Sequence, residues 1–567
     1  MSAANSLVGT SASDFVGATI VPLTNGNYLV ATPTWNNGAI VAAGAVTWAN
    51  GATGITGPVS AQNSLVGAAP FDRVGSETEW YYLSVWPLPD GNAVVVSPDW
   101  DNGTLVDAGA ATWIDGTVGL TGTLSAANSL VGTTAGDQLG AGGIDYGFSA
   151  LPGGRYAILS SAWSASGVEH AGAITWGDSA VGVRGPVTAE NSLVGATSQD
   201  FDLARVFALD DGNFVVGTPH WSSEDVQWVG AATWIDGSAP RVGALSTATS
   251  LVGSQQFDEV GVSVAALHGG RYVVASPSWR NGDAISAGAA TWVGSDGART
   301  GVVSAANSLV GADAGDAVGT EVVALTNGNY LVASPNWIRD GVTAAGAVTW
   351  GSGDTGIVGV VSTENSLVGD TTRDHVGSDI IALANGNAVV ASLAWHDLLG
   401  AVTWIDGTTG RIGTVSSANS LVSGVEFERI GNVVALGDTG NYLVPNADWK
   451  GHLGAAAWGD GRAGLVGVAS PANALIGVSP YYDVGRDVIA VGGGNALVTS
   501  DASVTLVRGT APTIGPVSGD NSALNLFGHP AHVLDYDAAH DRLVVGWSGD
   551  NYVSIFQTET LLANGFD

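Results

Sequence analysis

Cysteine is absent from this sequence, and lysine occurs once, as Lys450. Without cysteine the chain can form no disulfide, thiol nucleophile or zinc–thiolate site. Basic residues are scarce as well, because 17 Lys and Arg face 51 Asp and Glu, for a formal net charge of −34. Nucleic acids and anionic membrane surfaces are therefore poor partners, since both are bound mainly through cationic side chains.

Long apolar runs are also lacking. No stretch reaches the length of a membrane-spanning helix, and no signal peptide precedes the first repeated phrase, which opens at Asn5. A start inside a repeat predicts a monomeric module cut from a longer chain. The hydrophobic content of 45% is ample for a core, so the 83 glycines indicate turns at fixed positions and not a flexible linker.

Repetition is what the sequence has in abundance. The phrase Asn-Ser-Leu-Val-Gly, or a close variant of it, returns about every 58 residues. Its copies begin at Asn5, Asn63, Asn128, Asn191, Thr249, Asn307, Asn365, Asn419 and Asn473. A second phrase, typically Gly-Ala-Val-Thr-Trp, ends at Trp48, Trp113, Trp176, Trp234, Trp292, Trp350, Trp404 and Trp458. A residue present in every copy serves first to build the copies, so sites should be sought where one copy departs from the others.

Each copy consists of short apolar runs separated by glycine turns. The copy at 316–369 holds four such runs, at residues 322–325, 330–334, 346–350 and 357–361, the last continuing towards 365–369. The first two flank Asn327-Gly328, and Asn-Gly turns favour hairpins because both residues readily adopt positive φ. Long helical periodicity is absent. Each copy is therefore predicted to be a four-stranded antiparallel meander.

The apolar runs are continuous and lack the alternation of a half-exposed strand, which predicts sheets covered on both faces. Four-stranded sheets stacked in this way form a β-propeller. The hairpin count predicts an all-β fold, a single closed β-propeller of about ten four-stranded antiparallel blades over residues 1–567; nine or eight blades, or a β-solenoid, are the alternatives. Residues 10–528 supply nine consensus repeats and 529–567 a divergent last blade and tail. Residues 1–9 are the N-terminal strand that closes the last blade.

Two tryptophan columns and one acidic column run through the copies. Besides the third-strand tryptophans, a second column comprises Trp35, Trp100, Trp163, Trp221, Trp279, Trp337, Trp395 and Trp449. Both columns favour packing between blades, with aromatic sugar platforms as the alternative. The acids are Asp14, Asp72, Asp137, Asp258, Asp316, Asp374 and Glu428. We interpret them as turn carboxylates that accept backbone N–H bonds, with repeated cation sites as the alternative.

Catalytic and metal motifs find little support in this sequence. The histidines lie at unrelated phases, and neither a nucleophile elbow, nor a zinc-protease helix, nor a phosphate loop is present. Acid pairs for glycoside hydrolysis remain an open alternative. The densest potential ligand set is Asp535-Tyr536-Asp537 with His540-Asp541, but its spacing matches no known cation loop. We therefore predict no catalytic residues, no metal and no cofactor.

Aromatic residues outside the repeating columns are the binding candidates. They are Trp80, Tyr81, Tyr82 and Trp86 in an enlarged part of the second copy, and Trp228 in the fourth. The third copy carries Gly143-Ile144-Asp145-Tyr146-Gly147-Phe148 at a similar phase. Exposed aromatic rings near carboxylates suit sugars or peptides. The same rings would also fit the interpretation that they fill space created by their own insertion.

The run Asp316-Ala317-Val318-Gly319 through Ser334-Pro335 to Trp350 resembles the FG-GAP repeat of integrin-α-type propellers, although the Asp-x-Asp-x-Asp-Gly calcium loop of that repeat is missing. The repeated phrases together resemble tandem repeats of large secreted bacterial exoproteins, including filamentous-haemagglutinin-like adhesins. That resemblance implies a non-catalytic structural or adhesive module at the bacterial cell surface or outside the cell. Its partners would be a glycan, a host or bacterial surface protein, or itself. The alternative is a lectin or carbohydrate-active enzyme that uses the unusual loops of the second and third copies.

Overall fold

The protein folds into a succession of small β-sheets. The computed structural model describes residues 2–76, 84–141, 147–165, 167–297, 299–424, 428–501, 503–518, 521–524, 533–537, 540, 542–547 and 552–557. The chain forms two compact units, one comprising 1–274 with 293–303 and the other 275–292 with 304–567. Among the described residues, no helix is long and apolar enough to cross a membrane.

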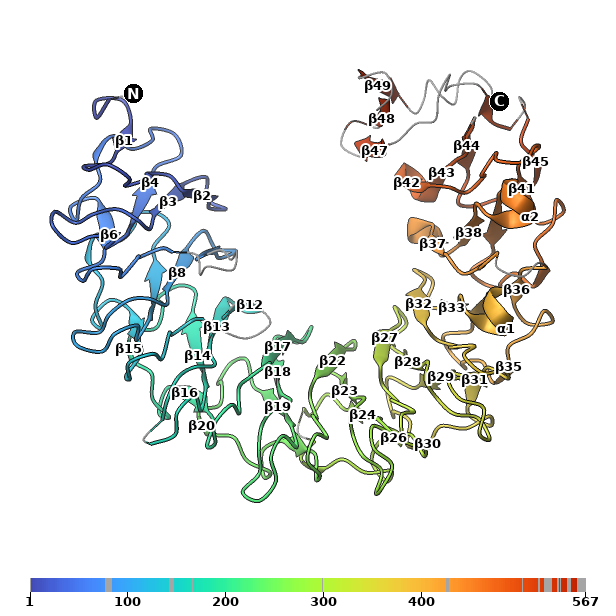
Figure 1. Cartoon of the computed structure of the whole chain (residues 1–567), viewed down its shortest axis with the longest axis horizontal. Coiled ribbons are helices and arrows are strands. Elements are labelled where there is room, and N and C mark those ends of the chain that lie inside the picture. Colours follow the sequence, from blue (N-terminus) through green and yellow to red (C-terminus); the bar gives the residue numbers. More distant parts are fainter. Residues whose placement is uncertain are drawn as a thin grey trace. The chain divides into compact units, whose positions relative to one another are not determined.

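The first unit contains only strands in its described part (Figure 1). They are β1 (Leu7–Val8), β2 (Thr19–Pro22), β3 (Tyr28–Thr32), β4 (Ala45–Ala49), β5 (Gly57–Pro58), β6 (Ser64–Val66), β7 (Val85–Pro87), β8 (Ala93–Ser97), β9 (Ala110–Ile114), β10 (Gly122–Thr123), β11 (Leu130–Val131), β12 (Phe148–Leu151), β13 (Arg155–Ser160), β14 (Ala173–Asp178), β15 (Gly185–Pro186), β16 (Ser192–Val194), β17 (Arg205–Ala208), β18 (Phe214–Thr218), β19 (Ala231–Ile235), β20 (Gly243–Ala244), β21 (Leu251–Val252), β22 (Ser263–Ala266) and β25 (Gly301–Val302). The division between the units falls in β23 (Tyr272–Ser276) and β24 (Ala289–Val293).

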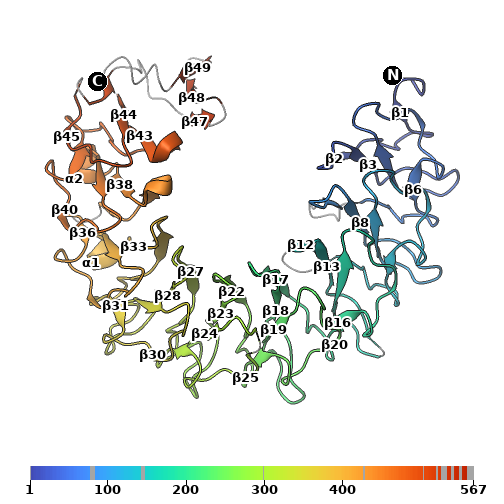
Figure 2. The same ribbon diagram turned by 180° about the vertical axis from the view of Figure 1, so that it is seen from behind.

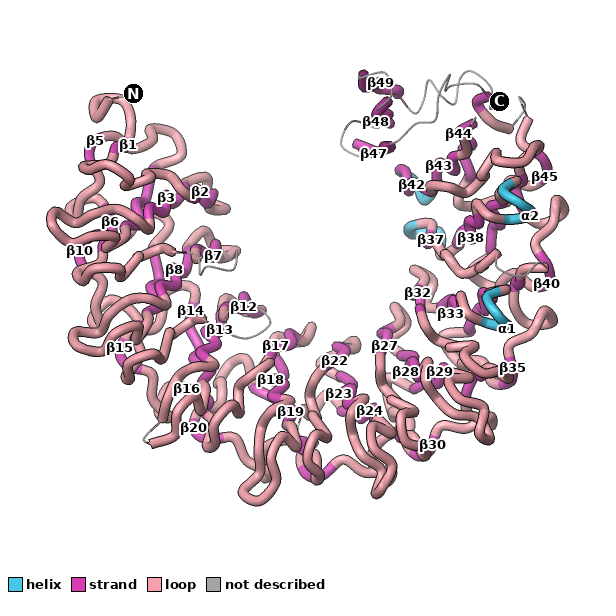
Figure 3. The backbone as a smooth tube through the Cα atoms, viewed as in Figure 1, coloured by secondary structure: helices cyan, strands magenta, loops and turns pink. Residues whose placement is uncertain are grey.

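The second unit adds a few helical turns to the same pattern (Figure 3). Its strands are β26 (Leu309–Val310), β27 (Glu321–Ala324), β28 (Tyr330–Ser334), β29 (Ala347–Gly351), β30 (Gly359–Val360), β31 (Ser366–Val368), β32 (Asp379–Ala382), β33 (Ala388–Ser392), β34 (Ala401–Ile405), β35 (Gly413–Thr414), β36 (Leu421–Val422), β37 (Val434–Ala435), β38 (Tyr442–Asn446), β39 (Ala455–Gly459), β40 (Gly467–Val468), β41 (Ala474–Ile476), β42 (Val488–Val491), β43 (Asn495–Thr499), β44 (Ser503–Val507), β45 (Gly515–Pro516), β46 (Ala523–Leu524), β47 (Val533–Asp537), β48 (Arg542–Trp547) and β49 (Tyr552–Gln557). Its helical turns are α1 (Trp395–Leu398), α2 (Trp449–His452) and the 3₁₀ turns Gly437–Thr439 and Gly492–Gly494.

One sheet shows the plan that most of the copies follow. Strands β2, β3 and β4 form an antiparallel meander, and β6 adds to β4 in the antiparallel sense. A fifth strand, β10, comes from the next copy and pairs with β6 in parallel, Gly122 opposite Leu65. The sheet order is therefore β10-β6-β4-β3-β2. In every copy built this way, a two-residue strand pairs with the sheet of the preceding copy. Figure 2 shows the succession of sheets from behind.

The expected fourth strand divides between two sheets. Residues 357–361 contain β30, which pairs in parallel with β26 of the preceding copy. The fourth strand of their own copy is β31, which pairs with β29. The sequence-predicted four-stranded blade is thus a five-stranded sheet, because the short apolar run before the Asn-Ser-Leu-Val phrase serves the neighbouring copy.

The sequence-based prediction of a closed β-propeller is wrong. In the described residues the sheets follow one another as separate small sheets, and none of them curls or closes. The strand expected to close the last blade, β1, pairs in parallel with β5 in a two-stranded sheet, Leu7 opposite Gly57 (Figure 3). The last described sheet, β47-β48-β49, has three strands, all from residues 533–557. The strand β1 finds its partner within the next copy, as β6 does, so no distant strand is needed to cover it, whereas β46 ends a four-stranded sheet in the described part of the chain.

The hydrophobic cores lie between consecutive sheets. One core joins Leu29 and Val46 of the first meander to Val95, Trp100 and Ile114 of the next. Strands such as β8 and β28 are buried along their whole length. The prediction of sheets covered on both faces is therefore confirmed for such strands, whereas Val553 and Ile555 of β49, in the last described sheet, are exposed.

Candidate functional site

A buried carboxylate returns just after the Asn-Ser-Leu-Val-Gly phrase in all but one of the copies, where Tyr482 replaces it. Asp316 is fully buried, and its Oδ2 accepts the N–H groups of Ala312 and Asp313 at 2.9 Å each. Its Oδ1 accepts the N–H of Ile338, also at 2.9 Å. The same three bonds recur at Asp14, Asp72, Asp137, Asp200 and Asp374. The turn-carboxylate interpretation is confirmed, and Asp200 joins the set although Val-Gly does not follow it.

Burial and hydrogen bonding act on these carboxylates in opposite directions. Desolvation raises the pKa of Asp72, Asp137, Asp200 and Asp316 above the usual value, even though backbone N–H bonds favour the charged form. Asp14 belongs to the first copy and is less enclosed. Desolvation raises its pKa too, but its hydrogen bonds together outweigh that effect and hold the pKa below the usual value.

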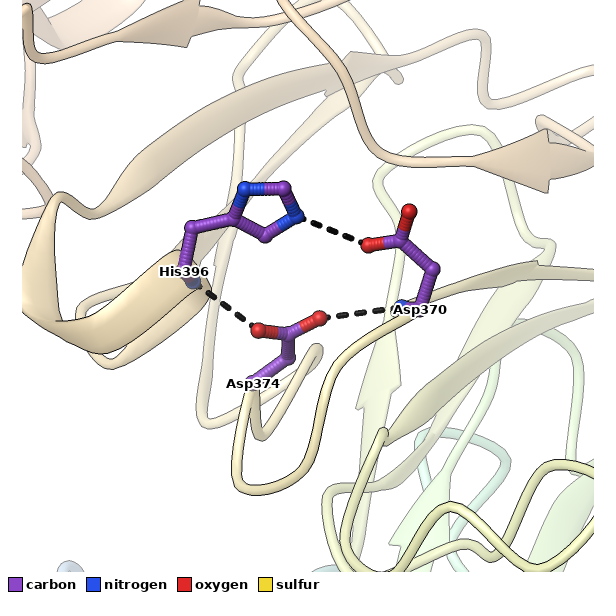
Figure 4. Close-up of side chains that lie close together, drawn as sticks. All are labelled: Asp370, Asp374 and His396. Atoms are coloured by element: carbon purple, nitrogen blue, oxygen red, sulfur yellow. Dashed lines mark hydrogen bonds and ion pairs between the residues drawn. The ribbon is translucent and has the colours of Figure 1, made fainter.

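Three potential metal ligands meet at one point of the described structure, formed by Asp370, Asp374 and His396 (Figure 4). Their ligand atoms lie within 4.8 Å of one another, and His396 Nε2 lies 2.9 Å from Asp370 Oδ1. Asp374 already accepts the N–H groups of Asp370 and Thr371 on Oδ2, and the Thr371 hydroxyl and the His396 N–H on Oδ1. A carboxylate has about four lone-pair sites. These four donors use them, so Asp374 has a structural role.

The ligand set expected at residues 535–541 is only partly described. Asp535 is exposed, and Asp537 Oδ2 lies 2.7 Å from His540 Nδ1. Asp541 lies outside the described residues. The described members form a surface ion pair and do not gather three ligand atoms.

Both tryptophan columns hold neighbouring copies together. Trp350 of the third-strand column donates its indole N–H to the Gly407 carbonyl of the next copy at 2.9 Å. Trp48, Trp113, Trp176, Trp292 and Trp404 make equivalent bonds at 2.7 to 3.1 Å. The second column is 2 to 6% exposed. The packing interpretation is therefore confirmed for these members, and the enclosed rings of the second column offer no free face to a sugar.

The sequence-predicted binding residues do not form one cluster. Trp80, Tyr81 and Tyr82 lie outside the described residues. Trp86, in β7, stacks on the buried ring of Phe148 with centroids 5.2 Å apart. Trp228 lies in a loop of another copy, where it stacks on a histidine ring. The structure thus gives Trp86 a packing partner and leaves Trp228 at a junction between copies.

A second group of aromatic residues emerges from the backbone conformation. The residue directly before the buried aspartate, here called the pre-aspartate position, has positive φ in each described copy. Its occupants, with φ of 64 to 86°, are Ser13, Phe71, Gly136, Gln199, Phe257, Gly315, Arg373 and Tyr481, the last preceding Tyr482 in place of aspartate. Glycine adopts this conformation without strain, whereas a bulky residue at positive φ is an outlier. Yet Phe71, Phe257 and Tyr481 are 56%, 41% and 73% exposed.

Two of these aromatics, Phe257 and Tyr481, contact rings contributed by the preceding copy. Trp228 has φ of 54° and lies parallel to His220 with ring centroids 4.9 Å apart, while its other contact is the edge of Phe257 at 5.3 Å. At a later junction, His452 stacks on Tyr481 at 5.6 Å. Sequence patterns missed His220, His452 and the pre-aspartate aromatics. The available signal was the glycine at positions 136 and 315, which marks a backbone that disfavours side chains.

The fold and these junctions define an all-β tandem-repeat protein whose adjacent copies share strands, carboxylate turns and tryptophan bonds. The chain belongs to the family described as "Repeat of unknown function (DUF5650)". That family's repeat matches residues 1–18, 22–76, 87–141, 150–201, 208–262, 266–320, 324–378, 382–432 and 437–486. Apart from the segment at 1–18, each matched segment begins at the end of the first strand of a meander or just after it.

No curated protein sequence matches the chain. Among solved structures, it is similar to a eukaryotic initiation factor, with a TM-score of 0.32 and 10% identity over 80% of this chain and 88% of that one. A candidate 6-phosphogluconolactonase from Bacteroides uniformis gives 0.25 and 13% over 62% and 92%. The extracellular domain of a candidate hybrid two-component system from B. thetaiotaomicron gives 0.24 and 9% over 95% and 64%. At these scores the similarities support no functional argument.

Proposed function

We propose that the chain is a non-catalytic structural and adhesive module of a secreted bacterial surface protein, and that it binds through side chains displayed at the junctions between copies. The observation that carries this proposal is that recurring and variable positions of the repeat lie in different surroundings. The recurring carboxylates, asparagines and Thr–Ser hydroxyl pairs are hydrogen-bonded inside the fold, while positions that vary, such as the pre-aspartate position, are exposed on the same backbone.

The recurring polar groups support a structural assignment. In the copy at 316–369, the hydroxyls of Thr349 and Ser366 are buried and 2.7 Å apart. Asn365 accepts the Ser362 N–H and the Ser366 hydroxyl, and donates to the Val360 carbonyl. A nucleophile or a general acid must reach a substrate. Groups enclosed in this way serve the architecture, which favours display and binding over turnover.

The variable positions support adhesion. Successive copies present one junction after another with the same backbone and different side chains, so weak contacts can add along an extended partner. The excess of acid also favours solubility of the free module. Bacterial surface or extracellular location is part of the proposal and rests on the resemblance of the repeated phrases to secreted adhesin repeats.

The proposal can be tested by adhesion of beads that carry the purified chain. Bacterial cells, mucin-coated wells and wells coated with the chain itself would serve as surfaces, and beads carrying an unrelated protein of similar net charge would be the control. Retention on at least one surface above the control is expected. Retention equal to the control on every surface would contradict the proposal.

A further inference from the structure

The pre-aspartate position carries aromatic side chains where the backbone favours glycine. Gly136 and Gly315 show that the fold tolerates glycine there, since their φ values of 79° and 86° match those of the aromatic copies. A side chain at positive φ is strained, and exposing a large ring to water adds no burial in return. Phe257 and Tyr481 each contact one ring of the preceding copy, but the 41% and 73% of these residues that stay exposed gain nothing from packing within the fold. Strained, exposed side chains of this kind indicate a role outside the fold.

The junction around Phe257 is a built aromatic surface. The ring planes of Trp228 and His220 are 17° apart, and the ring of Phe257 meets that of Trp228 at 67°. Three rings from two copies are therefore in contact, two of them stacked and the third edge-on. The backbone fixes this arrangement, because the Glu259 N–H donates to the Trp228 carbonyl at 3.4 Å. The loop that leads to Trp228 carries the exposed acids Glu224 and Asp225. Flat rings and carboxylates thus lie in one loop region.

The junction around Tyr481 repeats this chemistry with other residues. His452 and Tyr481 lie within 16° of parallel. The imidazole also lies 3.4 Å from Asp448 and 3.3 Å from Asp483. The N–H groups of Tyr482 and Asp483 donate to the His452 carbonyl, which couples the two copies as at the first junction. Two junctions in different units therefore combine a histidine, a second aromatic ring and nearby carboxylates.

We propose that these two junctions are binding sites for uncharged pyranose units of a polysaccharide. This inference deepens the proposed adhesive function and rests on it. The apolar faces of a pyranose stack on flat aromatic rings, and its hydroxyls donate to carboxylates. Uronic or sialic acids are disfavoured, because the sites are bordered by acids and the chain carries a net charge of −34. Separate ring pairs, one per junction, suit a polymer that contacts several copies more than a single continuous protein interface.

Glycine substitutions test the proposal without damaging the fold. Phe257→Gly and Tyr481→Gly install the residue that other copies already use at this position, so the melting temperature should be unchanged or raised. Affinity electrophoresis in gels containing xyloglucan, galactomannan, β-1,3-glucan or polygalacturonate measures binding. We expect at least one neutral polymer to retard the native chain, and the double variant to bind it about tenfold more weakly.

A matched control removes exposed apolar side chains elsewhere. Val118 and Ile412 are 68% and 58% exposed in other loops, and Val118→Ala with Ile412→Ala should leave retardation unchanged. Three results would overturn the proposal: no retardation by any neutral polymer, preferential retardation by polygalacturonate, or unaltered binding by the folded double-glycine variant. If the native chain self-associates in sedimentation experiments and the double-glycine variant does not, the rings serve contacts between separate molecules of this protein. That result would also overturn the proposal. Bead adhesion that survives the glycine substitutions would reject these sites while leaving the adhesive function in place.

Discussion

At the residue scale, each repeated phrase of the sequence corresponds to a small hydrogen-bonded motif in the structure. Asn365, the first residue of its phrase, bonds to the backbone of Ser362 and Val360. The buried aspartates and tryptophans follow the same logic. What the sequence could not reveal is the conformation at Phe257 and Tyr481, because φ is set by the loop and both residue types are common in other surroundings. Only comparison with Gly136 and Gly315 at the same phase carries that information.

The Thr349–Ser366 pair is expected to behave as one unit. Because Ser366 donates to Asn365, it accepts the hydroxyl of Thr349. Ser366→Ala leaves the buried hydroxyl of Thr349 without its acceptor and should lower the free energy of unfolding by about 2 kcal/mol. Thr349→Ala removes that donor, so the double variant should be no less stable than Ser366→Ala alone, as measured by urea unfolding.

One natural copy supports this expectation. Ala457 and Ala474 occupy the two positions in β39 and β41, so both hydroxyls are lost together there. Strictly additive losses in the double-mutant cycle would show that the two hydroxyls act independently.

Asp316 offers a sharper test of the carboxylate turns. Asp316→Asn retains the shape but points an amide donor at backbone N–H groups that need an acceptor. We expect a loss of about 2 kcal/mol in the free energy of unfolding, from the unpaired donors that remain. The exposed turn residue Asp354→Asn is the matched control and should change stability little. Equal stability of the two variants in urea would contradict the structural role.

At the scale of elements, strands within a meander were predictable and the shared strand was not. The run at 330–334 coincides with β28 because a glycine turn and a following proline delimit it. The run at 357–361 looks similar in composition, yet β30 joins the preceding sheet. Periodicity reports that a segment is buried, but it carries no information on which of two adjacent sheets accepts a two-residue strand.

Contacts between adjacent copies depend on glycine where a tryptophan approaches. A Cβ added to Gly356, which has φ of 71°, would lie 2.7 Å from Trp292 Cβ. Gly359 also has positive φ, but nothing lies within 4 Å of its added Cβ. Both alanine variants incur backbone strain of about 1 kcal/mol. Gly356→Ala should be the less stable by a further 1 kcal/mol or more, because overpacking displaces the ring.

Thermal unfolding of Gly356→Ala and Gly359→Ala, with indole fluorescence as the probe, separates the two effects. A ring displaced from the Gly353 carbonyl, to which Trp292 donates at 3.1 Å, should change its emission only in the first variant. Identical melting temperatures and spectra would mean that this contact is not limiting for packing between the copies.

At the scale of the whole molecule, the number of meanders was readable from the glycine turns, but their closure was not. A spare strand phrase at the N-terminus is compatible with a ring and also with a strand that pairs with the copy directly after it. The pairing of β1 with β5 is local, and local pairing involves less loss of chain entropy than joining distant segments. Sequence counts repeats well because each turn is encoded locally, whereas closure depends on a competition between partners that no single repeat encodes.

The ionisable groups are expected to give the stability of the whole molecule an unusual dependence on pH. The buried carboxylates of Asp72, Asp137, Asp200 and Asp316 have folded pKa values raised above 3.8 by desolvation. Their contribution to stability is therefore fully present below pH 3.8 and is lost as pH rises through the folded pKa. Asp14 has a lowered pKa, so its contribution is present above pH 3.8 and is lost only as pH falls through that lower value. Repulsion from a net charge of −34 also weakens on acidification.

The raised pKa values of the four buried carboxylates and the weakened repulsion favour the folded state as the pH falls from 7 towards about 4.5, and over this interval Asp14 stays ionised and keeps its contribution. The urea midpoint should therefore rise over this interval, opposite to the acid destabilisation common in proteins with salt-bridged carboxylates. Added salt at 0.5 M screens surface repulsion, whose Debye length falls below about 5 Å, and should raise the midpoint mainly at pH 7. The increase that persists in salt reports the buried carboxylates, and it should shrink in Asp316→Asn. A midpoint that falls between pH 7 and 4.5 would show that desolvation does not dominate at these turns.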